Sequence, residues 1–230
     1  ASHAIGAQCD GRPVGNGQYS DITVFSFHPV KIITTGEGGL ALTNNPALAE
    51  RVMRLRSHGV TRDPDRMLDL TGVSHCDPWY YQQVELGFNY RMTDIQAALG
   101  LSQLQRLDDF IEARHGLAQR YNRLLGHLPL QMPWQDPRHR SALHLYPIQL
   151  ADEVVRRNTF QFLRDVGVGV NVHYIPVHTQ PDFQRLGFTR GQFPVAEAYY
   201  ARALSLPLHP KLTEAEQDHI CRCLDQILTV

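Results

Sequence analysis

The sequence has 230 residues, of which 43% are hydrophobic, which is enough for a core and for one large domain or two small ones. Its 22 basic and 23 acidic residues give a net charge of −1, which argues against a nucleic-acid-binding protein with a broad positive field. No apolar run is long enough to span a membrane, and four cysteines without metal or redox spacing indicate a reduced, cytoplasmic setting.

The first predicted feature is a short strand followed by a lysine on a rigid turn. β-Branched and aromatic residues at 22–25 are typical of a buried strand, and Pro29 prevents that strand from continuing. Lys31 follows, before a glycine-rich stretch at 36–39 and a second predicted strand at 39–42. A lysine held near a carbonyl compound can form a Schiff base, as with pyridoxal phosphate, although most lysines are solvated surface charges. Lys31 is therefore the first candidate for covalent chemistry.

Helix signals dominate the next part of the chain. Asn45 and Pro46 open a predicted helix that runs to about residue 56, and residues 58–81 lack a clear period and predict a long loop. Thr93 and Gln96 form a capping-box pattern, and the apolar stripe after them predicts a helix that continues, with a break, to about residue 125. Strands and helices thus alternate, which indicates an α/β fold.

Prolines and arginines near residues 133–140 indicate a crossover into a second, smaller domain. The elements expected in it are strands at 142–150 and 168–174 and helices at 154–166, 194–203 and 213–227. We therefore predict two domains, at 1–125 and 126–230. The twelve histidines are scattered without the spacing of metal ligands, so no metal site is expected.

Two polar positions accompany Lys31 in the first domain. The hydroxyl of Ser26, five residues earlier, suits a phosphate ester oxygen, although a serine at a strand end can also bond its own backbone. A polar block at 87–98 precedes a helix N-terminus, where backbone donors favour anions. A capped helix start explains part of this block, but it does not explain Asn89 or Arg91.

A third block, at 172–178, ends a predicted strand at the turn made by Pro176. Such a turn can aim side chains into a cleft, which makes His173, Tyr174 and His178 candidates for substrate binding. The alternative is a core strand with two satisfied histidines.

Residues 26–31, 36–39 and 87–98 together resemble the cofactor segments of the DegT/DnrJ/EryC1/StrS sugar aminotransferases. The resemblance implies a fold-type I, α/β transferase dependent on pyridoxal 5′-phosphate, with residues 1–125 as part of the cofactor-binding large domain and 126–230 as a smaller α+β domain. It also implies that Lys31 binds the cofactor covalently, Ser26 binds its phosphate and His3 stacks on its ring. Asn89 would reach the phosphate in the neighbouring subunit, which implies a homodimer with shared sites.

Residues 55–63, 78–81, 85–91 and 204–210 resemble one subgroup, the transaminases of pseudaminic acid synthesis. This implies transfer of an amino group from L-glutamate to carbon 4 of a UDP-linked 4-keto-6-deoxy N-acetyl sugar, with His173, Tyr174 and His178 near the sugar. Another UDP- or dTDP-linked keto sugar is the nearest alternative. A non-catalytic ligand-binding protein or an inactive fragment of the same fold is an alternative from a different class.

Residues 1–7 resemble a segment from the middle of the family's proteins. The resemblance implies that the aspartate which pairs with the pyridine nitrogen lies immediately before Ala1, so that the large domain is incomplete. We accordingly expect residues 1–230 alone to have negligible activity. Lys31 itself argues against the related 3-dehydratases, which carry histidine in its place.

Overall fold

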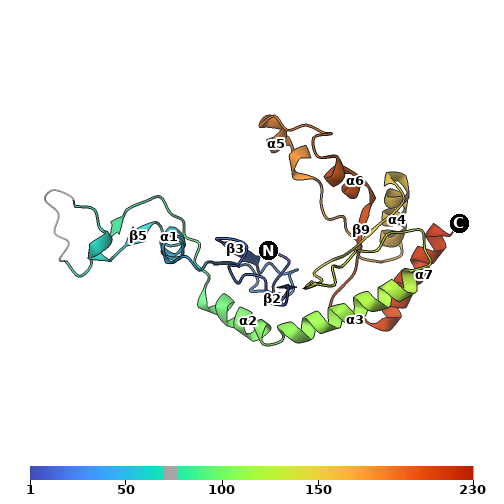
Figure 1. The fold of residues 1–230 in the computed structure, drawn as a ribbon, viewed down its shortest axis with the longest axis horizontal. Coiled ribbons are helices and arrows are strands. Elements are labelled where there is room, and N and C mark those ends of the chain that lie inside the picture. The colour runs from blue at the N-terminus through green and yellow to red at the C-terminus, as the bar shows by residue number, and fades with distance from the viewer. Residues whose placement is uncertain (70–76, 230) are drawn as a thin grey trace. The chain divides into compact units, whose positions relative to one another are not determined.

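The computed structural model describes residues 1–69 and 77–229, and the chain forms two compact units, Ala1–Leu107 and Asp108–Val230. Figure 1 shows their elements in chain order. No helix formed by these described residues is long and apolar enough to cross a membrane.

The first unit is built from small antiparallel hairpins and two helices. Strand pairs β1–β2, β3–β4 and β5–β6 are each antiparallel. The elements are β1 (Gln8–Cys9), β2 (Arg12–Pro13), β3 (Thr23–Ser26), β4 (Gly39–Leu42), α1 (Pro46–Leu55), β5 (Val60–Thr61), the 3₁₀ turn η1 (Pro64–Arg66), β6 (Gln82–Gln83) and α2 (Asp94–Leu104).

The strand positions and helix caps predicted for the first unit are confirmed, but the strand predicted as buried, β3, is buried on one face only. Strands β3 and β4 flank the lysine turn, as predicted, and Asn45 caps α1 by accepting from the amides of Ala47 and Leu48. Thr93 and Gln96 make both bonds of a capping box at the start of α2. The predicted loop at 58–81 contains β5 and η1, and its residues 70–76 lie outside the described part of the chain.

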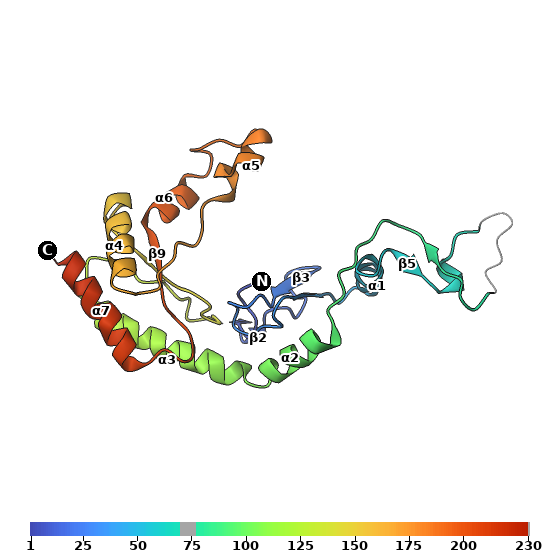
Figure 2. The same ribbon diagram turned by 180° about the vertical axis from the view of Figure 1, so that it is seen from behind.

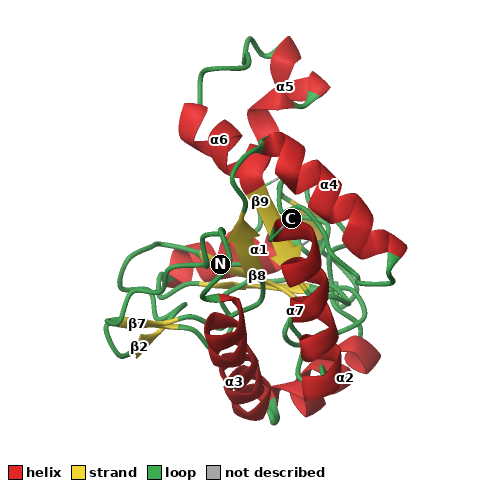
Figure 3. Ribbon diagram, turned by 90° about the vertical axis from the view of Figure 1, so that its right-hand side faces the viewer, coloured by secondary structure: helices red, strands yellow, loops and turns green. Residues whose placement is uncertain are grey.

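The second unit holds the larger core. Strands β8 and β9 pair antiparallel, α4 packs against α7, and α7 lies beside the C-terminal half of α3 (Figures 2 and 3). The elements are α3 (Leu107–Leu125), β7 (His139–Arg140), β8 (Tyr146–Gln149), α4 (Glu153–Asp165), the 3₁₀ turn η2 (Val177–Thr179), α5 (Pro181–Arg185), α6 (Pro194–Arg202), β9 (Ala203–Leu206) and α7 (Glu214–Leu228).

The strand predicted at 168–174 is wrong, because the backbone turns on itself there: the Val170 amide donates to the carbonyl of Val168 at 2.9 Å. All four residues of β9 are buried, and its backbone pairs with β8 from Tyr146 to Gln149. The segment at 168–174 contributes one isolated bridge, between Asn171 and Ser205. Strand β9 follows α6 directly, without the turn residues that mark most strand starts, and this is why the sequence pattern missed it.

The strand predicted at 142–150 forms only at Tyr146–Gln149. Leu143 has a φ of 47°, in the left-handed region, which interrupts an extended strand. The carbonyl groups of Leu143 and His144 accept from the buried guanidinium of Arg114, at 3.3 and 3.2 Å, and are therefore occupied outside the ladder.

The two compact units divide after Leu107, the first residue of α3, whereas the sequence pattern assigns the whole helix to the first domain. The predicted break is present at Gln105 and Arg106, and the buried face of α3 then packs within the second unit. Tyr121, which is fully buried, donates its hydroxyl to the carbonyl of Pro207 at 3.0 Å and packs on Tyr146. These contacts place α3 in the second unit. Periodicity in the sequence shows that one face of the helix is buried, but not which elements cover it.

Candidate functional site

Lys31 lies in the loop that joins β3 to β4, and we call residues 23–42 the lysine hairpin. Ser26, the last residue of β3, lies opposite Gly39, the first residue of β4. Beyond this pair the loop closes on itself, because the amide of Phe27 donates to the carbonyl of Gly38 at 2.8 Å. The loop is therefore a folded extension of a hairpin that carries a lysine.

The backbone on both sides of Lys31 is held in place. The Lys31 amide donates to the carbonyl of His28 at 2.9 Å, which closes a tight turn. The next two side chains, Ile32 and Ile33, are buried in the core of the unit. Thr35 is also buried, and its amide donates to the carbonyl of Phe27 at 3.0 Å. Anchors before and after the lysine thus limit where its side chain can reach.

The environment of Lys31 favours the neutral amine. Its side chain is half-buried, and this burial lowers its pKa from the ordinary lysine value. A lysine with a lowered pKa holds a larger neutral fraction near neutral pH, and only the neutral amine attacks a carbonyl carbon. Burial on a fixed turn therefore supplies both conditions for covalent chemistry.

The side chains of Ser26, Lys31 and Asn89 make no hydrogen bond or ion pair with any other residue that the structure describes. The alternative for Ser26, a hydroxyl that bonds its own backbone, is therefore not what forms. The hydroxyl and the primary amine, which lie on the same hairpin, suit a ligand that carries an anionic ester and an aldehyde. This donor set fits pyridoxal phosphate.

The glycine-rich stretch allows close packing against the start of α2. A Cβ atom at Gly38 would overlap the Thr35 hydroxyl and would lie 2.7 Å from the Met92 side chain. The Gln96 side-chain amide donates to the carbonyl of Glu37 at 3.1 Å. The glycine is therefore explained by a close approach, and the loop after Lys31 is attached to the helix that follows Asn89.

Asn89 is exposed, but the backbone around it is fixed to the C-terminal end of α1. The Phe88 amide donates to the carbonyl of Leu55 at 2.8 Å, and the Tyr90 amide donates to the carbonyl of Arg56 at 2.9 Å. Asn89 itself forms an isolated antiparallel bridge with Ser57. An exposed amide on a fixed backbone can contact a molecule outside this chain.

His3 lies in a turn near the start of the first unit, where the amide of Ala4 donates to the carbonyl of Ala1 at 2.9 Å. Its ring is half-buried. Stacking of this ring on a cofactor stays a prediction.

The three candidates of the second unit have different environments. His173 lies 2.9 Å from the Ser205 hydroxyl, and Tyr174 is 56% exposed. His178 is buried and donates to Glu197 at 2.8 Å, which holds the pKa of that carboxyl below its usual range. The contacts of His178 favour a satisfied core histidine. Tyr174 instead lines an apolar groove of about 750 Å³, with Phe193 among its other walls.

The first unit also has a hollow of about 740 Å³ between β4, α1 and the segment before α2. Arg56 and Arg91 line it, and Lys31, Ser26 and His3 do not. The candidate site is therefore the lysine hairpin, which carries the amine of lowered pKa. The sequence pattern assigns no role to Arg56, and it identifies Arg91 only as a residue that helix capping leaves unexplained.

Comparison with known proteins identifies the family to which this sequence is similar. The sequence profile of the DegT/DnrJ/EryC1/StrS aminotransferase family matches residues 1–225. The chain is 35% identical to the spore coat polysaccharide biosynthesis protein SpsC of Bacillus subtilis and 35% identical to a UDP-4-amino-4,6-dideoxy-N-acetyl-beta-L-altrosamine transaminase of Campylobacter jejuni. Each alignment covers 99% of this chain, but only 58% and 57% of the two relatives.

The fold is also similar to that of a solved sugar aminotransferase structure. The sugar aminotransferase Spr1654 of Streptococcus pneumoniae, described as putative, matches in its PMP form with a TM-score of 0.87 and 30% identity, over 99% of this chain and 55% of that one. Its PLP form matches with a TM-score of 0.86. The chain therefore has the fold of just over half of such a protein.

Proposed function

Because the chain belongs to the DegT/DnrJ/EryC1/StrS aminotransferase family and has its fold-type I, α/β fold, we propose that it carries the cofactor lysine of a nucleotide-sugar aminotransferase. The observation that carries the proposal is Lys31, a half-buried amine of lowered pKa on a fixed hairpin loop. Pyridoxal 5′-phosphate, when bound, supplies the electron sink that such a transfer needs.

Each residue of the lysine hairpin has a role in this proposal. The Lys31 amine holds the cofactor covalently and, once released, takes a proton from the α-carbon of the amino donor. The Ser26 hydroxyl donates to the cofactor phosphate, and the ring of His3 stacks on the cofactor. In the second half of the reaction, Lys31 delivers a proton to the sugar carbon that receives the amino group.

Asn89 acts, in the same proposal, on the cofactor phosphate of a second copy of the chain. Its exposed amide, which no described residue engages, supports this role. Two sites would then share residues across a homodimer. Neither site would be complete without the partner.

For the substrates we propose L-glutamate as amino donor and a UDP-linked 4-keto-6-deoxy N-acetyl sugar as acceptor. The similarity to the Campylobacter jejuni transaminase supports this choice, and Tyr174 is the exposed candidate for sugar contact. A different UDP- or dTDP-linked keto sugar is the nearest alternative. Product formation across a panel of such sugars separates them.

The cofactor assignment can be tested by peptide mass, because residues 1–230 contain two lysines, Lys31 on the hairpin and Lys211 outside it. The full-length protein is incubated with pyridoxal 5′-phosphate, reduced with borohydride and digested. We expect a pyridoxyl mass on the peptide that contains Lys31. Lys211→Arg, the matched control, should keep this adduct, and Lys31→Arg should lose it together with turnover.

An adduct on any lysine other than Lys31, with none on Lys31, would contradict the assignment, as would normal turnover by the Lys31→Arg variant. If the wild-type protein takes up no cofactor at all, the alternative of a non-catalytic ligand-binding protein is favoured instead.

A further inference from the structure

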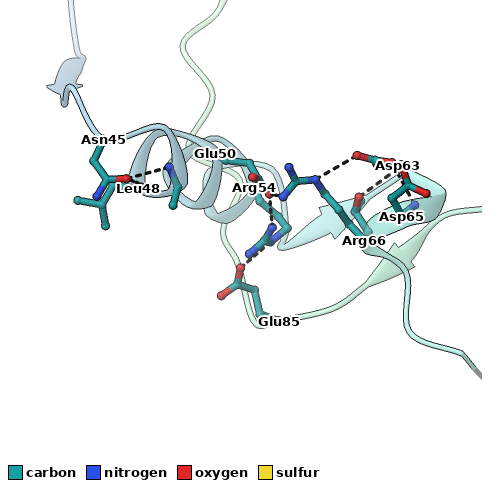
Figure 4. A network of polar contacts seen from close by, with 10 residues as sticks. Asn45, Leu48, Glu50, Arg54, Asp63, Asp65, Arg66 and Glu85 are labelled. Atoms are coloured by element: carbon teal, nitrogen blue, oxygen red, sulfur yellow. Dashed lines mark hydrogen bonds and ion pairs between the residues drawn. The ribbon is translucent and has the colours of Figure 1, made fainter.

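A network of charged side chains joins α1 to the segment that leads to Asn89 (Figure 4). The Nε of Arg54, on α1, donates to Oε1 of Glu85 at 2.6 Å, and its terminal nitrogen donates to Glu50 at 3.0 Å. Only about a fifth of each side chain in the Arg54–Glu85 pair is exposed, at 21% and 22%. The guanidinium of Arg54 holds the pKa of Glu85 below its usual range. The pair is therefore ionised at neutral pH and partly shielded from water.

The network extends beyond this pair to the 3₁₀ turn η1. Arg66 contacts the same Glu50 carboxylate, and its Nε donates to Asp63 at 3.0 Å. Figure 4 shows Arg54 and Arg66 approaching Glu50 from different segments. Charged groups from α1, η1 and the chain at Glu85 thus meet around one helix, and networks of this kind are stronger than isolated surface pairs.

Close backbone packing joins the same two segments between Glu85 and Asn89. A Cβ atom at Gly87 would overlap the amide nitrogen of Gly59, and one at Gly59 would overlap the carbonyl oxygen of Glu85. Gly59 also has a φ of 68°, a conformation that favours glycine. The backbone at Gly59 can therefore approach the backbone at 85–87 this closely only because both contact positions, Gly59 and Gly87, are glycines.

Hydrogen bonds complete the attachment at Asn89. Phe88 accepts from the amide of His58 at 2.8 Å and donates to Leu55, and Tyr90 donates to Arg56. Both neighbours of Asn89 in the chain are thus bonded to the region just after Arg54. The Arg54–Glu85 pair is the side-chain link at the start of this segment, four residues before Asn89.

We propose that Arg54 and Glu85 are positioning residues that hold Asn89 where its amide binds the cofactor phosphate of the partner subunit. The inference rests on the proposed function of Asn89. Neither residue touches the cofactor. Each acts through the backbone: the ion pair limits the conformations of the free segment, so less conformational entropy is lost when the Asn89 amide binds.

The test measures cofactor affinity of the full-length apoprotein, by absorbance titration with pyridoxal 5′-phosphate and, separately, with pyridoxal. Arg54→Gln and Glu85→Gln should each weaken pyridoxal 5′-phosphate binding about tenfold, the effect of one lost hydrogen bond to a charged group. Pyridoxal lacks the phosphate, so its affinity should not change. A structural defect would lower both affinities.

The controls come from the same network. Arg51 contacts the other oxygen of Glu85 at 3.3 Å but is 65% exposed, so Arg51→Gln should bind the cofactor as the wild type does. Asn89→Ala should weaken binding on its own. Adding Arg54→Gln to it should cause no further loss, because the two residues act as one unit.

Wild-type affinity in both Arg54→Gln and Glu85→Gln would overturn the inference. Equal losses of affinity for pyridoxal and pyridoxal 5′-phosphate would also overturn it. Such a result would mean that the Arg54–Glu85 pair only stabilises the fold. Failure of the proposed function is distinguishable, because in that case the wild-type protein would form no adduct on Lys31.

Discussion

At the scale of single residues, position and burial decide chemistry more than residue type does. Lys31 and His178 are both partly or wholly withdrawn from water, but Lys31 meets no described partner, whereas His178 is held by Glu197. The unpaired amine is available for reaction. The paired imidazole stabilises the loop before α6, and its contacts leave little of it to meet a substrate.

The lowered pKa of Lys31 can be measured directly. Reductive methylation with ¹³C-formaldehyde labels the lysines, and NMR then follows each signal with pH. Because burial disfavours the charged ammonium, we expect the Lys31 signal to titrate at a lower pH than a lysine in a blocked peptide. Lys31→Arg assigns the signal. A titration at or above the peptide's pH would mean that the amine is not desolvated.

At the scale of elements, the helix starts are set by side chains next to them in sequence. Thr213 begins α7 with a capping box: its hydroxyl accepts from the Glu216 amide at 3.3 Å, and Glu216 accepts from the Thr213 amide at 2.8 Å. That backbone donor holds the pKa of Glu216 below its usual range. Helix α7 carries buried residues of the second unit, so its cap should matter to the whole unit.

Thr213→Ala should therefore lower the free energy of unfolding of the second unit by about 1 kcal/mol, as is usual for the loss of an N-cap side chain. Urea denaturation followed by circular dichroism measures the change. Glu216→Gln keeps an acceptor for the Thr213 amide and should cost less. An unchanged midpoint for Thr213→Ala would show that the bonds contribute nothing.

At the scale of the whole molecule, the two units differ in how much core each contains. The main hydrophobic cluster lies entirely within the second unit, from Ala118 to Leu224. In the first unit, strands β3 and β4 form a sheet of two strands, on which Val24 and Leu40 remain 51% and 44% exposed. A sheet of only two strands that leaves one face exposed is marginal alone. The second unit is therefore the more self-sufficient of the two.

We accordingly expect a fragment of residues 108–230 to fold on its own with one cooperative urea transition. Leu204 is fully buried in the cluster, so Leu204→Ala should destabilise this fragment by about 2–5 kcal/mol. The control substitution Val195→Ala, at an exposed position, should change the free energy of unfolding little. A fragment without a cooperative transition would show that the second unit depends on the first.

Local chemistry explains what could be read from the sequence. The lysine turn between two short strands was predicted because proline and glycine act within a few residues, and the caps at Asn45, Thr93 and Thr213 were recognised for the same reason. Of the candidate site, Ser26 and Lys31 were correctly placed on one hairpin. Their roles toward a cofactor stay proposals.

Contacts between distant segments were beyond the sequence pattern. Strand β9, the attachment of α3 to the second unit and the burial of His178 depend on which surfaces meet. The Arg54–Glu85 pair joins residues 31 positions apart, so no local spacing points to it.

By itself, then, the sequence determined the family, the helix starts and the lysine hairpin, because these follow from short motifs and from steric rules that act within a few residues. Only the tertiary structure decided that burial lowers the pKa of Lys31 and what holds Asn89 in place. Desolvation depends on burial by the folded chain, and the backbone of Asn89 is fixed by an α1 that lies more than thirty residues earlier in the chain.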